Sequence, residues 1–308
     1  MLDTCARSYY YNYYASNNGW RQDASQKTKL IYRLKKLQAI HSIVGEAIHS
    51  SITDLIINPN LTKADFKRLT NKKIRESYRN SLTMKDEWIQ DPKIFKMVQD
   101  VYYFGKVKLE TQQKTIEKIE ACGANLSRCI SLAEIKADSV IVTIDELKEF
   151  TFDGFKTYVK VDALYQNRDT GKYVVVDWKT GNGNSLEVEQ LLLYVYFTHK
   201  MYNIPIEEIE ARLEYCVDGD CAIYTFTSND MNMAEKMING HIKKMQEYMF
   251  NIQDNIPMPE IYFPENRSSK CRYCNFQEIC IGDTFKKSEE EAIKFSLEAN
   301  RASEMCVQ

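Results

Sequence analysis

Hydrophobic residues in the first part of the chain recur at the spacing of an amphipathic helix. Between about residues 29 and 57, apolar side chains return every three or four positions and so share one helix face. Asn58 and Pro59 end this pattern. Two or three further helices are expected between about residues 62 and 137. This part of the chain is therefore predicted to be helical.

The pattern changes near Asp138, where short β-branched and aromatic runs alternate with turn residues. The loop at 167–171 and the Asp218-Gly219 pair are both typical of hairpin turns. This order predicts an α/β fold with a mixed β-sheet core at 138–227, flanked by helices. Strands are predicted at 139–144, 156–165, 172–178, 211–217 and 221–227, with helices at about 185–201 and 229–251.

The 308 residues are 44% hydrophobic and 27% charged, an ordinary balance for a soluble globular protein. No apolar run approaches the roughly 20 residues of a membrane span. The start of the chain lacks the apolar centre of a signal peptide, so we expect a cytoplasmic protein without a membrane segment. The net charge of −2 gives no overall attraction to nucleic acid. Any contact with DNA therefore requires a local basic patch or bound metal.

Two predicted strands carry charged residues at their ends. Asp162 ends one strand, and Asp177 and Lys179 end the next, after a hairpin. Residues i and i+2 share a face of a strand, so Asp177 and Lys179 point the same way, with the Trp178 carbonyl between them. Two carboxylates and a carbonyl form an oxygen site that suits Mg²⁺ or Mn²⁺. Lys179 would then lie near a metal-bound water or a scissile phosphate, as phosphodiester hydrolysis requires; solvated charges at strand ends are the alternative.

This set of residues resembles a known group of enzymes. Asp162, followed one hairpin later by Asp177-Trp-Lys179-Thr-Gly, is similar to the RecB-like branch of the PD-(D/E)XK nucleases. The resemblance implies a restriction-endonuclease-like fold and a divalent-metal-dependent deoxyribonuclease. It favours an exonuclease over an endonuclease, acting on single-stranded or end-frayed DNA in repair, recombination or anti-phage defence. The most similar subgroups are the CRISPR-adaptation exonucleases and the AddB-type nuclease domains.

Two further motifs carry the same resemblance. Gln190-Leu-Leu-Leu-Tyr194 is similar to the Gln-x-x-x-Tyr element of the branch, and Gly45-Glu-Ala-Ile-His49 to its Gly-x-x-x-His element. Gln190 and Tyr194 share a helix face, from which they could bond the lysine, a metal-bound water or a phosphate. The resemblance implies that His49 is a third metal ligand, with a structural histidine as the alternative; core packing is the alternative for Tyr194. Val159 departs from the pattern, which often has a glycine three residues before the first aspartate.

Three of the nine cysteines have the spacing of metal ligands: Cys271, Cys274 and Cys280. Cys5 opens a Cys-Ala-Arg-Ser-Tyr-Tyr-Tyr segment, which resembles the first element of the iron–sulfur members of the branch. The resemblance implies a [4Fe–4S] cluster on these four cysteines, which would staple the N-terminal segment to residues 265–285. Structural zinc is the alternative cofactor, and Cys306 the alternative fourth ligand. The others are expected to be buried small hydrophobic side chains: Cys122, Cys129, Cys216 and Cys221.

The helical stretch at 58–137 is expected to be an insertion into a single nuclease domain at 1–308. Its basic residues could follow a phosphate backbone, with a solvated helix face as the alternative; the candidates are Lys67, Lys72, Lys73 and Arg75. The sequence lacks the Gly-x-x-x-x-Gly-Lys-[Ser/Thr] phosphate loop of a helicase. The resemblance implies DNA as the substrate and a helicase, an integrase or another complex member as the partner. One alternative is a catalytically silent scaffold of the same fold that binds DNA or a partner. A second alternative is a redox sensor.

Overall fold

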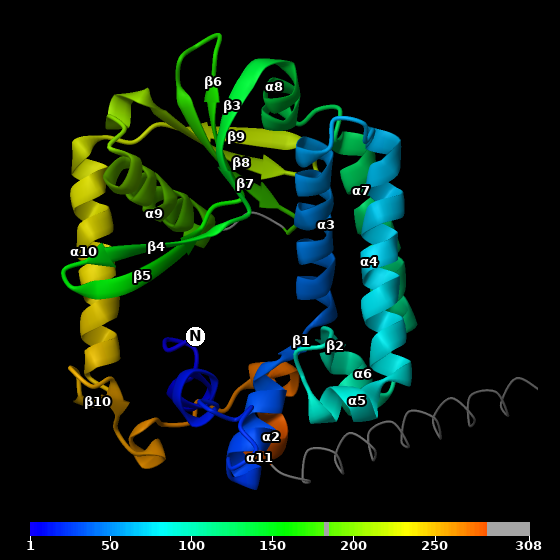
Figure 1. Cartoon of the computed structure of the whole chain (residues 1–308), viewed down its shortest axis with the longest axis vertical. Helices are drawn as coiled ribbons and strands as arrows, with labels where there is room; N and C mark the ends of the chain where they lie inside the picture. The colour runs from blue at the N-terminus through cyan, green and yellow to red at the C-terminus, as the bar shows by residue number, and fades with distance from the viewer. Residues whose placement is uncertain (182–184, 282–308) are drawn as a thin grey trace, which may run out of the picture. The chain divides into compact units, whose positions relative to one another are not determined.

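The computed structural model describes residues 1–181 and 185–281 (Figure 1). The chain divides into two compact units. We call Ile40–Thr83 with Asp100–Lys244 the sheet unit, and Met1–Ala39, Met84–Gln99 and Met245–Gln308 the terminal unit. Each is described by itself. Within the described residues, no helix is both long enough and apolar enough to span a membrane.

The sheet unit is built on a five-stranded mixed sheet. Its order is β3 (Ser139–Ile144), β6 (Ala163–Asn167), β7 (Tyr173–Lys179), β8 (Ile209–Tyr215) and β9 (Asp220–Tyr224). The pair β7–β8 is parallel and the other pairs are antiparallel. The parallel pair is joined through helix α9 (Ser185–Tyr202) and the short 3₁₀ turn Ile206–Glu208, because parallel neighbours require a crossover connection. The predicted mixed α/β core is confirmed.

Helices flank this sheet and bury its apolar side chains. Leu191 and Val195 of α9 and Ala234 of α10 (Ser228–Gln246) pack with Val175 and Leu213 of the central strands. Each such buried aliphatic side chain contributes about 1.5–3 kcal/mol of hydrophobic free energy. Helices α3 and α4 lie side by side, and α7 contacts both (Figure 1). The helices are α3 (Ile40–Ile57), α4 (Lys63–Thr83), α6 (Gln99–Phe104), α7 (Leu109–Asn125) and α8 (Ile130–Asp138).

The terminal unit brings the two ends of the described chain together. The Arg7 backbone N–H donates to the Pro264 carbonyl at 3.2 Å, and the rings of Tyr10 and Phe263 lie 4.7 Å apart. Its elements near the N-terminus are α1 (Ala6–Tyr10), the π-helical turn Tyr11–Ala15 and α2 (Gln26–Lys35). The others are β1 (Leu37–Gln38), α5 (Lys85–Gln90), β2 (Met97–Val98), β10 (Met249–Asn251), β11 (Ile256–Pro257), η3 (Glu260–Tyr262), η4 (Ser269–Tyr273) and α11 (Gln277–Cys280).

Two sequence-based predictions of helices are wrong. The helix predicted at 29–57 is two helices, α2 and α3, because buried Leu37 leaves the helical path to pair with Met97 in a short parallel bridge. The stretch 62–137 holds five helices, more than the two or three expected.

The strand predicted at 156–165 is also two strands. Strand β5 (Phe155–Lys160) pairs with β4 (Leu147–Phe152), which the sequence analysis missed, whereas β6 pairs with β3 and β7. The chain bends at Asp162, whose carbonyl accepts a hydrogen bond from the Asp145 N–H at 3.0 Å. The predicted turns are confirmed: Gly171 and Gly219 take φ values of 75° and 74°, which glycine adopts without steric cost.

Candidate functional site

Asp162 and Asp177 lie next to each other at one end of the hairpin β6–β7. Ala163 pairs with Val176, so the next positions in this antiparallel register are Asp162 and Asp177. Asp162 thus precedes β6 instead of ending a strand as predicted. The Trp178 N–H donates to Asp162 Oδ2 at 2.8 Å, which fixes this carboxylate against β7. Both side chains are largely buried, with 15% and 6% of their surfaces exposed.

This pairing of carboxylates separates their proton affinities. Burial and the neighbouring charge of Asp162 raise the pKa of Asp177 to about 7. Burial opposes ionisation of Asp162 as well, but the hydrogen bond and charge of His49 and the Trp178 N–H outweigh it and lower the Asp162 pKa. Two buried carboxylates in contact are stabilised by a bound proton or by a cation.

His49 reaches this pair from helix α3. Its Nδ1 lies 3.2 Å from Asp162 Oδ1. Burial alone would lower the His49 pKa, but the hydrogen bond and charge of Asp162 raise it overall. Gly45, one turn earlier, lies against the end of β7: a Cβ at this position would stand 3.4 Å from Thr180 Oγ1. The Gly-x-x-x-His spacing therefore serves a close approach of α3 to the strand that carries Asp177.

Lys179 connects the carboxylates to helix α9. Its Nζ lies 2.5 Å from Asp177 Oδ2 and donates to Gln190 Oε1 at 2.8 Å. Gln190 Nε2 in turn donates to Tyr194 Oη at 2.6 Å. Burial and the charges of Asp177 and Asp162 raise the Tyr194 pKa, so its hydroxyl stays protonated. The structure thus brings together the predicted residues of the strand and helix motifs.

One neighbouring pair was missed from the sequence. Tyr215 is paired with Lys179 across β7–β8, and its hydroxyl donates to Glu187 Oε2 at 3.2 Å. Glu187 is buried in the first turn of α9. Burial and this carboxylate, with a contribution from Asp177, raise the Tyr215 pKa to about 12. The sequence could have indicated Glu187 as a neighbour of the site, because it lies three residues before Gln190 and so on the same helix face.

The chemistry of these side chains suits a divalent metal, although no group of three or more His, Cys, Asp or Glu side chains is arranged around a metal position in the described residues. Carboxylate oxygens with one imidazole are the donors that Mg²⁺ and Mn²⁺ accept. Burial, and after it the charge of Asp162, raises the Asp177 pKa, and a bound cation would offset both effects. Trp178 stands between Asp177 and Lys179 in β7, and the role of its carbonyl stays a prediction.

All four predicted cluster ligands belong to the terminal unit, although the described residues there form no group of three or more cysteines arranged around a metal position. Burial raises the Cys274 pKa, and the nearby thiols of Cys5 and Cys271 raise it further. Burial also raises the Cys280 pKa to about 11, with contributions from Cys274, Glu265 and Cys5. All four are free thiols. The alternative ligand Cys306 lies outside the described residues.

Backbone amides point at two of these sulfur atoms. The Phe276 N–H donates to Cys274 Sγ and the Ser268 N–H to Cys271 Sγ, each at 3.4 Å. The bond to Cys274 acts to lower the pKa of its thiol, but burial outweighs it and raises the pKa overall. Asn266 Nδ2 donates to the Thr4 carbonyl at 2.9 Å, which holds the residue before Cys5 beside the C-terminal cysteines.

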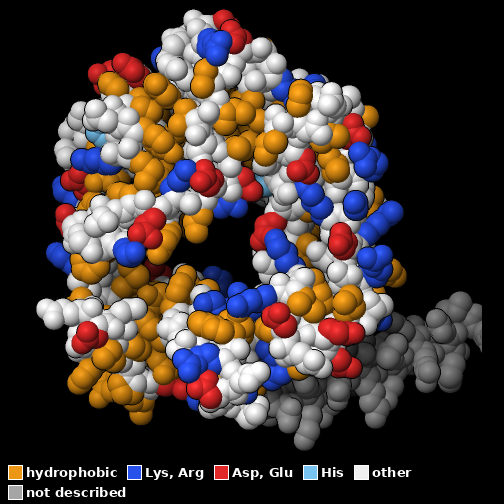
Figure 2. Space-filling model, viewed as in Figure 1, with side chains coloured by type: hydrophobic (Ala, Val, Ile, Leu, Met, Phe, Trp, Pro, Cys, Tyr) orange, Lys and Arg blue, Asp and Glu red, His pale blue; other side chains and the backbone are white. Residues whose placement is uncertain are grey.

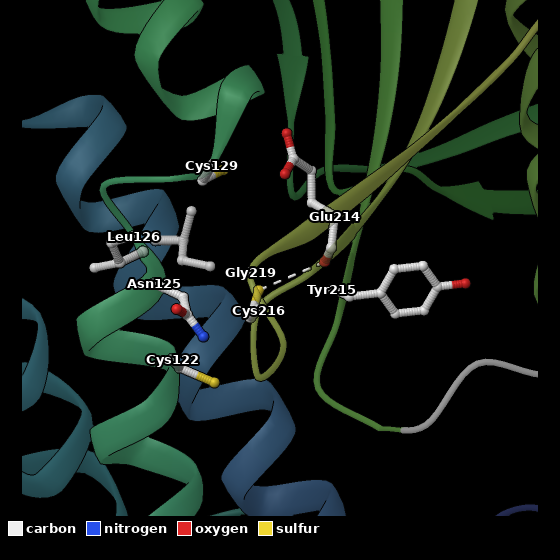
Figure 3. Close-up of a pocket in the computed structure, with 9 residues that line it drawn as sticks. Cys122, Asn125, Leu126, Cys129, Glu214, Tyr215, Cys216 and Gly219 are labelled. Carbon is white, nitrogen blue, oxygen red and sulfur yellow. Dashed lines mark hydrogen bonds between the residues drawn. The ribbon is translucent and has the colours of Figure 1, made fainter.

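Three of the other cysteines line one small pocket in the sheet unit, together with Glu214 (Figure 3). Cys122 comes from α7, Cys129 precedes α8, and Cys216 follows β8. Burial raises the Cys122 pKa to about 11 and that of Cys216 well above its usual value. Of the four cysteines expected to be buried, Cys122 is buried, whereas Cys129, Cys216 and Cys221 are half-buried. Protonated thiols are poor nucleophiles, so these pKa shifts give no sign of a reactive cysteine in the pocket.

The predicted DNA-binding residues of α4 fall into two groups. Lys67 forms an ion pair with Glu120, and Lys73 contacts Asp54 at 2.7 Å and Ser50 at 2.6 Å. These two charges are therefore matched within the unit. Lys72 and Arg75 are exposed and have no ion pair in the part of the chain that the structure describes.

Two carboxylates and a lysine thus lie at one end of neighbouring strands in a mixed sheet, an arrangement compatible with a hydrolase. The family model described as the PD-(D/E)XK nuclease superfamily matches residues 1–281. The chain belongs to this superfamily of nucleases. No curated protein matches the sequence.

Proposed function

We propose that this protein is a divalent-metal-dependent deoxyribonuclease, and that it acts as an exonuclease on single-stranded or end-frayed DNA. The observation that carries the proposal is the contact between two buried carboxylates, Asp162 and Asp177, with Lys179 at 2.5 Å from the second. Lys179 and His49 offset part of this negative charge within the fold, yet the pKa of Asp177 stays raised to about 7, so the pair favours a further cation. In a catalytic role, the two carboxylates would bind a divalent cation next to the scissile phosphate.

Each side chain then has a separate task. His49, Asp162, Asp177 and the Trp178 carbonyl would hold Mg²⁺ or Mn²⁺, which supplies an activated water and neutralises charge on the phosphate. Lys179 stabilises the negative charge that develops on the phosphate oxygens. Gln190 accepts from Lys179 Nζ and is itself held by Tyr194, so this pair keeps the ammonium group oriented.

We propose further that Cys5, Cys271, Cys274 and Cys280 bind a [4Fe–4S] cluster, with structural zinc as the alternative. The nearby thiols and the two N–H···S bonds support a soft-metal site. Its role would be to staple α1 to the segment around η4 and α11. The same resemblance supports membership of the RecB-like iron–sulfur branch, a role in DNA repair, recombination or anti-phage defence, and action beside a helicase or integrase.

A digestion of end-labelled DNA tests the proposed activity. We expect purified protein to shorten single-stranded DNA progressively from an end when Mg²⁺ or Mn²⁺ is added, and to do nothing in the presence of a chelator. Duplex DNA with blunt ends and circular single-stranded DNA are the matched substrates. Cleavage of the circle would replace the exonuclease with an endonuclease. No cleavage of any substrate with either metal would favour a catalytically silent scaffold.

A further inference from the structure

One face of helix α4 carries a row of cations. Arg68, Lys72, Arg75 and Arg79 follow one another at intervals of four, three and four residues, so they form one stripe on the helix. All four are exposed, whereas Phe66 and Ile74 of the same helix are buried. We call these four residues the α4 basic stripe. Figure 2 shows Lys and Arg side chains gathered over α4 on the right of the view.

The charges of this stripe are mostly unmatched. Arg68 pairs with Asp65 at 2.8 Å, but Lys72, Arg75 and Arg79 have no ion pair among the described residues. The stripe lines a surface hollow together with Asn71 and the single carboxylate Glu76. The whole chain has a net charge of −2, so this concentration of positive charge is local and not a general property of the surface.

The stripe belongs to the same unit as the candidate active site. Lys73, next to Lys72 in sequence, donates to Ser50 and Asp54 of α3. Ser50 follows His49, so the middle of the stripe is level with the candidate metal ligand along the helix pair. Two packed helices have axes about 8–10 Å apart. The stripe therefore lies on the helix that packs against α3, on an exposed face that does not contribute to the active site.

We propose that the α4 basic stripe binds the phosphate backbone of DNA flanking the cleavage site, an inference that rests on the proposed nuclease function. Eleven residues of helix extend about 16 Å, which corresponds to roughly five phosphates of one strand. Guanidinium groups bind phosphate with two parallel hydrogen bonds, and three of the four cations are arginines. The hollow keeps a net positive charge, since Glu76 is the single carboxylate among four cations.

The test compares two triple variants with equal change in charge. One replaces the unmatched cations: Lys72→Ala, Arg75→Ala and Arg79→Ala. The control replaces exposed lysines elsewhere in the sheet unit: Lys108→Ala, Lys236→Ala and Lys243→Ala. Both are made with Asp177→Asn, so that DNA is bound without being cut. Fluorescence anisotropy gives Kd for a labelled 20-nucleotide strand at several salt concentrations.

We expect the stripe variant to bind at least tenfold more weakly at low salt, and the control to stay within about twofold. The slope of log Kobs against log salt concentration should fall by about 2 in the stripe variant, because each lost phosphate contact on a single strand removes about 0.7. Unchanged affinity and slope in the stripe variant, or equal losses in the control, would overturn the proposal. Competition by polyglutamate as strong as that by DNA would also overturn it, in favour of an acidic protein partner.

Cleavage distinguishes failure of this inference from failure of the proposed function. With Asp177 intact, the stripe variant should cut a 20-nucleotide strand more slowly and a 4-nucleotide strand at the wild-type rate, because the short strand cannot reach the stripe. Wild-type protein that cuts neither strand contradicts the nuclease proposal. Wild-type protein that cuts both, with no effect of the stripe substitutions, contradicts only the inference about α4.

Discussion

The candidate active site and the cysteine site are assembled in different ways. In the sheet unit, Asp162, Asp177 and Lys179 come from one hairpin and its flanks, and hydrogen bonds between them already fix their positions. In the terminal unit, Cys5 is near enough to Cys274, at the opposite end of the described chain, to raise the pKa of that thiol. The first site depends on strand geometry, whereas the second depends on contacts such as that of Asn266 with Thr4.

The ionisable side chains of the two sites also differ in their protonation. Burial and the charge of Asp162 together raise the pKa of Asp177 to about 7. The thiols of Cys274 and Cys280 remain protonated, since burial raises their pKa values. A metal at the first site would replace a proton shared by carboxylates, whereas a metal at the second must displace protons from thiols. The comparison predicts separable effects on cleavage, on metal content and on stability.

The largest expected effect is on cleavage. Asp177→Asn and Lys179→Ala should each slow DNA hydrolysis by on the order of 10²–10³-fold or more, because charge stabilisation is lost where the phosphate reacts. Asp169→Asn is the matched control, since Asp169 is an exposed aspartate in the loop of the same hairpin. Circular dichroism should show all three variants folded. A folded Asp177→Asn protein that cuts DNA at the wild-type rate would contradict the active-site assignment.

The shared strand face of Asp177 and Lys179 could be predicted because it follows from the two-residue period of a strand. The same holds for Gln190 and Tyr194, which are one helical turn apart. The bend at Asp162 could not be predicted in this way. Residues 156–165 have the composition of one strand, and only the pairing of β4 with β5 divides them between two sheets.

Other differences between prediction and structure arise where a side chain contacts a residue that is distant in the sequence. Lys67 and Lys73 look like exposed cations in a basic helix, but Glu120 of α7 and Asp54 of α3 pair with them. Glu187 resembles an ordinary acidic residue in the first turn of a helix. In the structure it accepts a hydrogen bond from the Tyr215 hydroxyl, beside the candidate active site. Sequence periodicity predicts on which face of a helix or strand a side chain lies. It does not predict which residue of a neighbouring element will contact that side chain.

The second expected effect concerns the cysteine site alone. Protein purified without oxygen should be brown and hold about four irons per chain. Cys5→Ala should lose the iron and lower the midpoint of thermal unfolding, because α1 loses its anchor. DNA cleavage per folded molecule should change less than in Asp177→Asn. Iron analysis, thermal unfolding and cleavage on the same sample separate these effects.

Cys306→Ala is the control for that substitution and should keep both the iron and the stability. Loss of iron in Cys306→Ala with retention in Cys5→Ala would make Cys306 the fourth ligand. A colourless protein with one zinc per chain would replace the cluster with zinc and leave the staple in place.

The smallest expected effect is a pH dependence of stability that belongs to the active site. Asp177 has a pKa of about 7 in the metal-free fold, against roughly 3.9 in an unfolded chain. The folded state therefore binds more protons between these values, and the free energy of unfolding falls as pH rises from about 4 to 7. The raised pKa of His49 adds a fall above about pH 6.5. The lowered pKa of Asp162 acts only below about pH 4, where stability is lost on acidification.

Urea unfolding in a chelator, followed by Trp178 fluorescence in a Trp20→Phe, Trp88→Phe background, measures this change in the sheet unit. The slope should not exceed about 1.4 kcal/mol per pH unit for each group. Asp177→Asn should remove the fall between about pH 4 and 6, while the control Asp169→Asn keeps it, because asparagine does not titrate. Cys274 and Cys280 add nothing in this range, since burial raises the pKa values of their thiols. Parallel curves for wild type and Asp177→Asn would show that neither burial nor the charge of Asp162 raises the Asp177 pKa, and would remove the main support for a cation between the carboxylates.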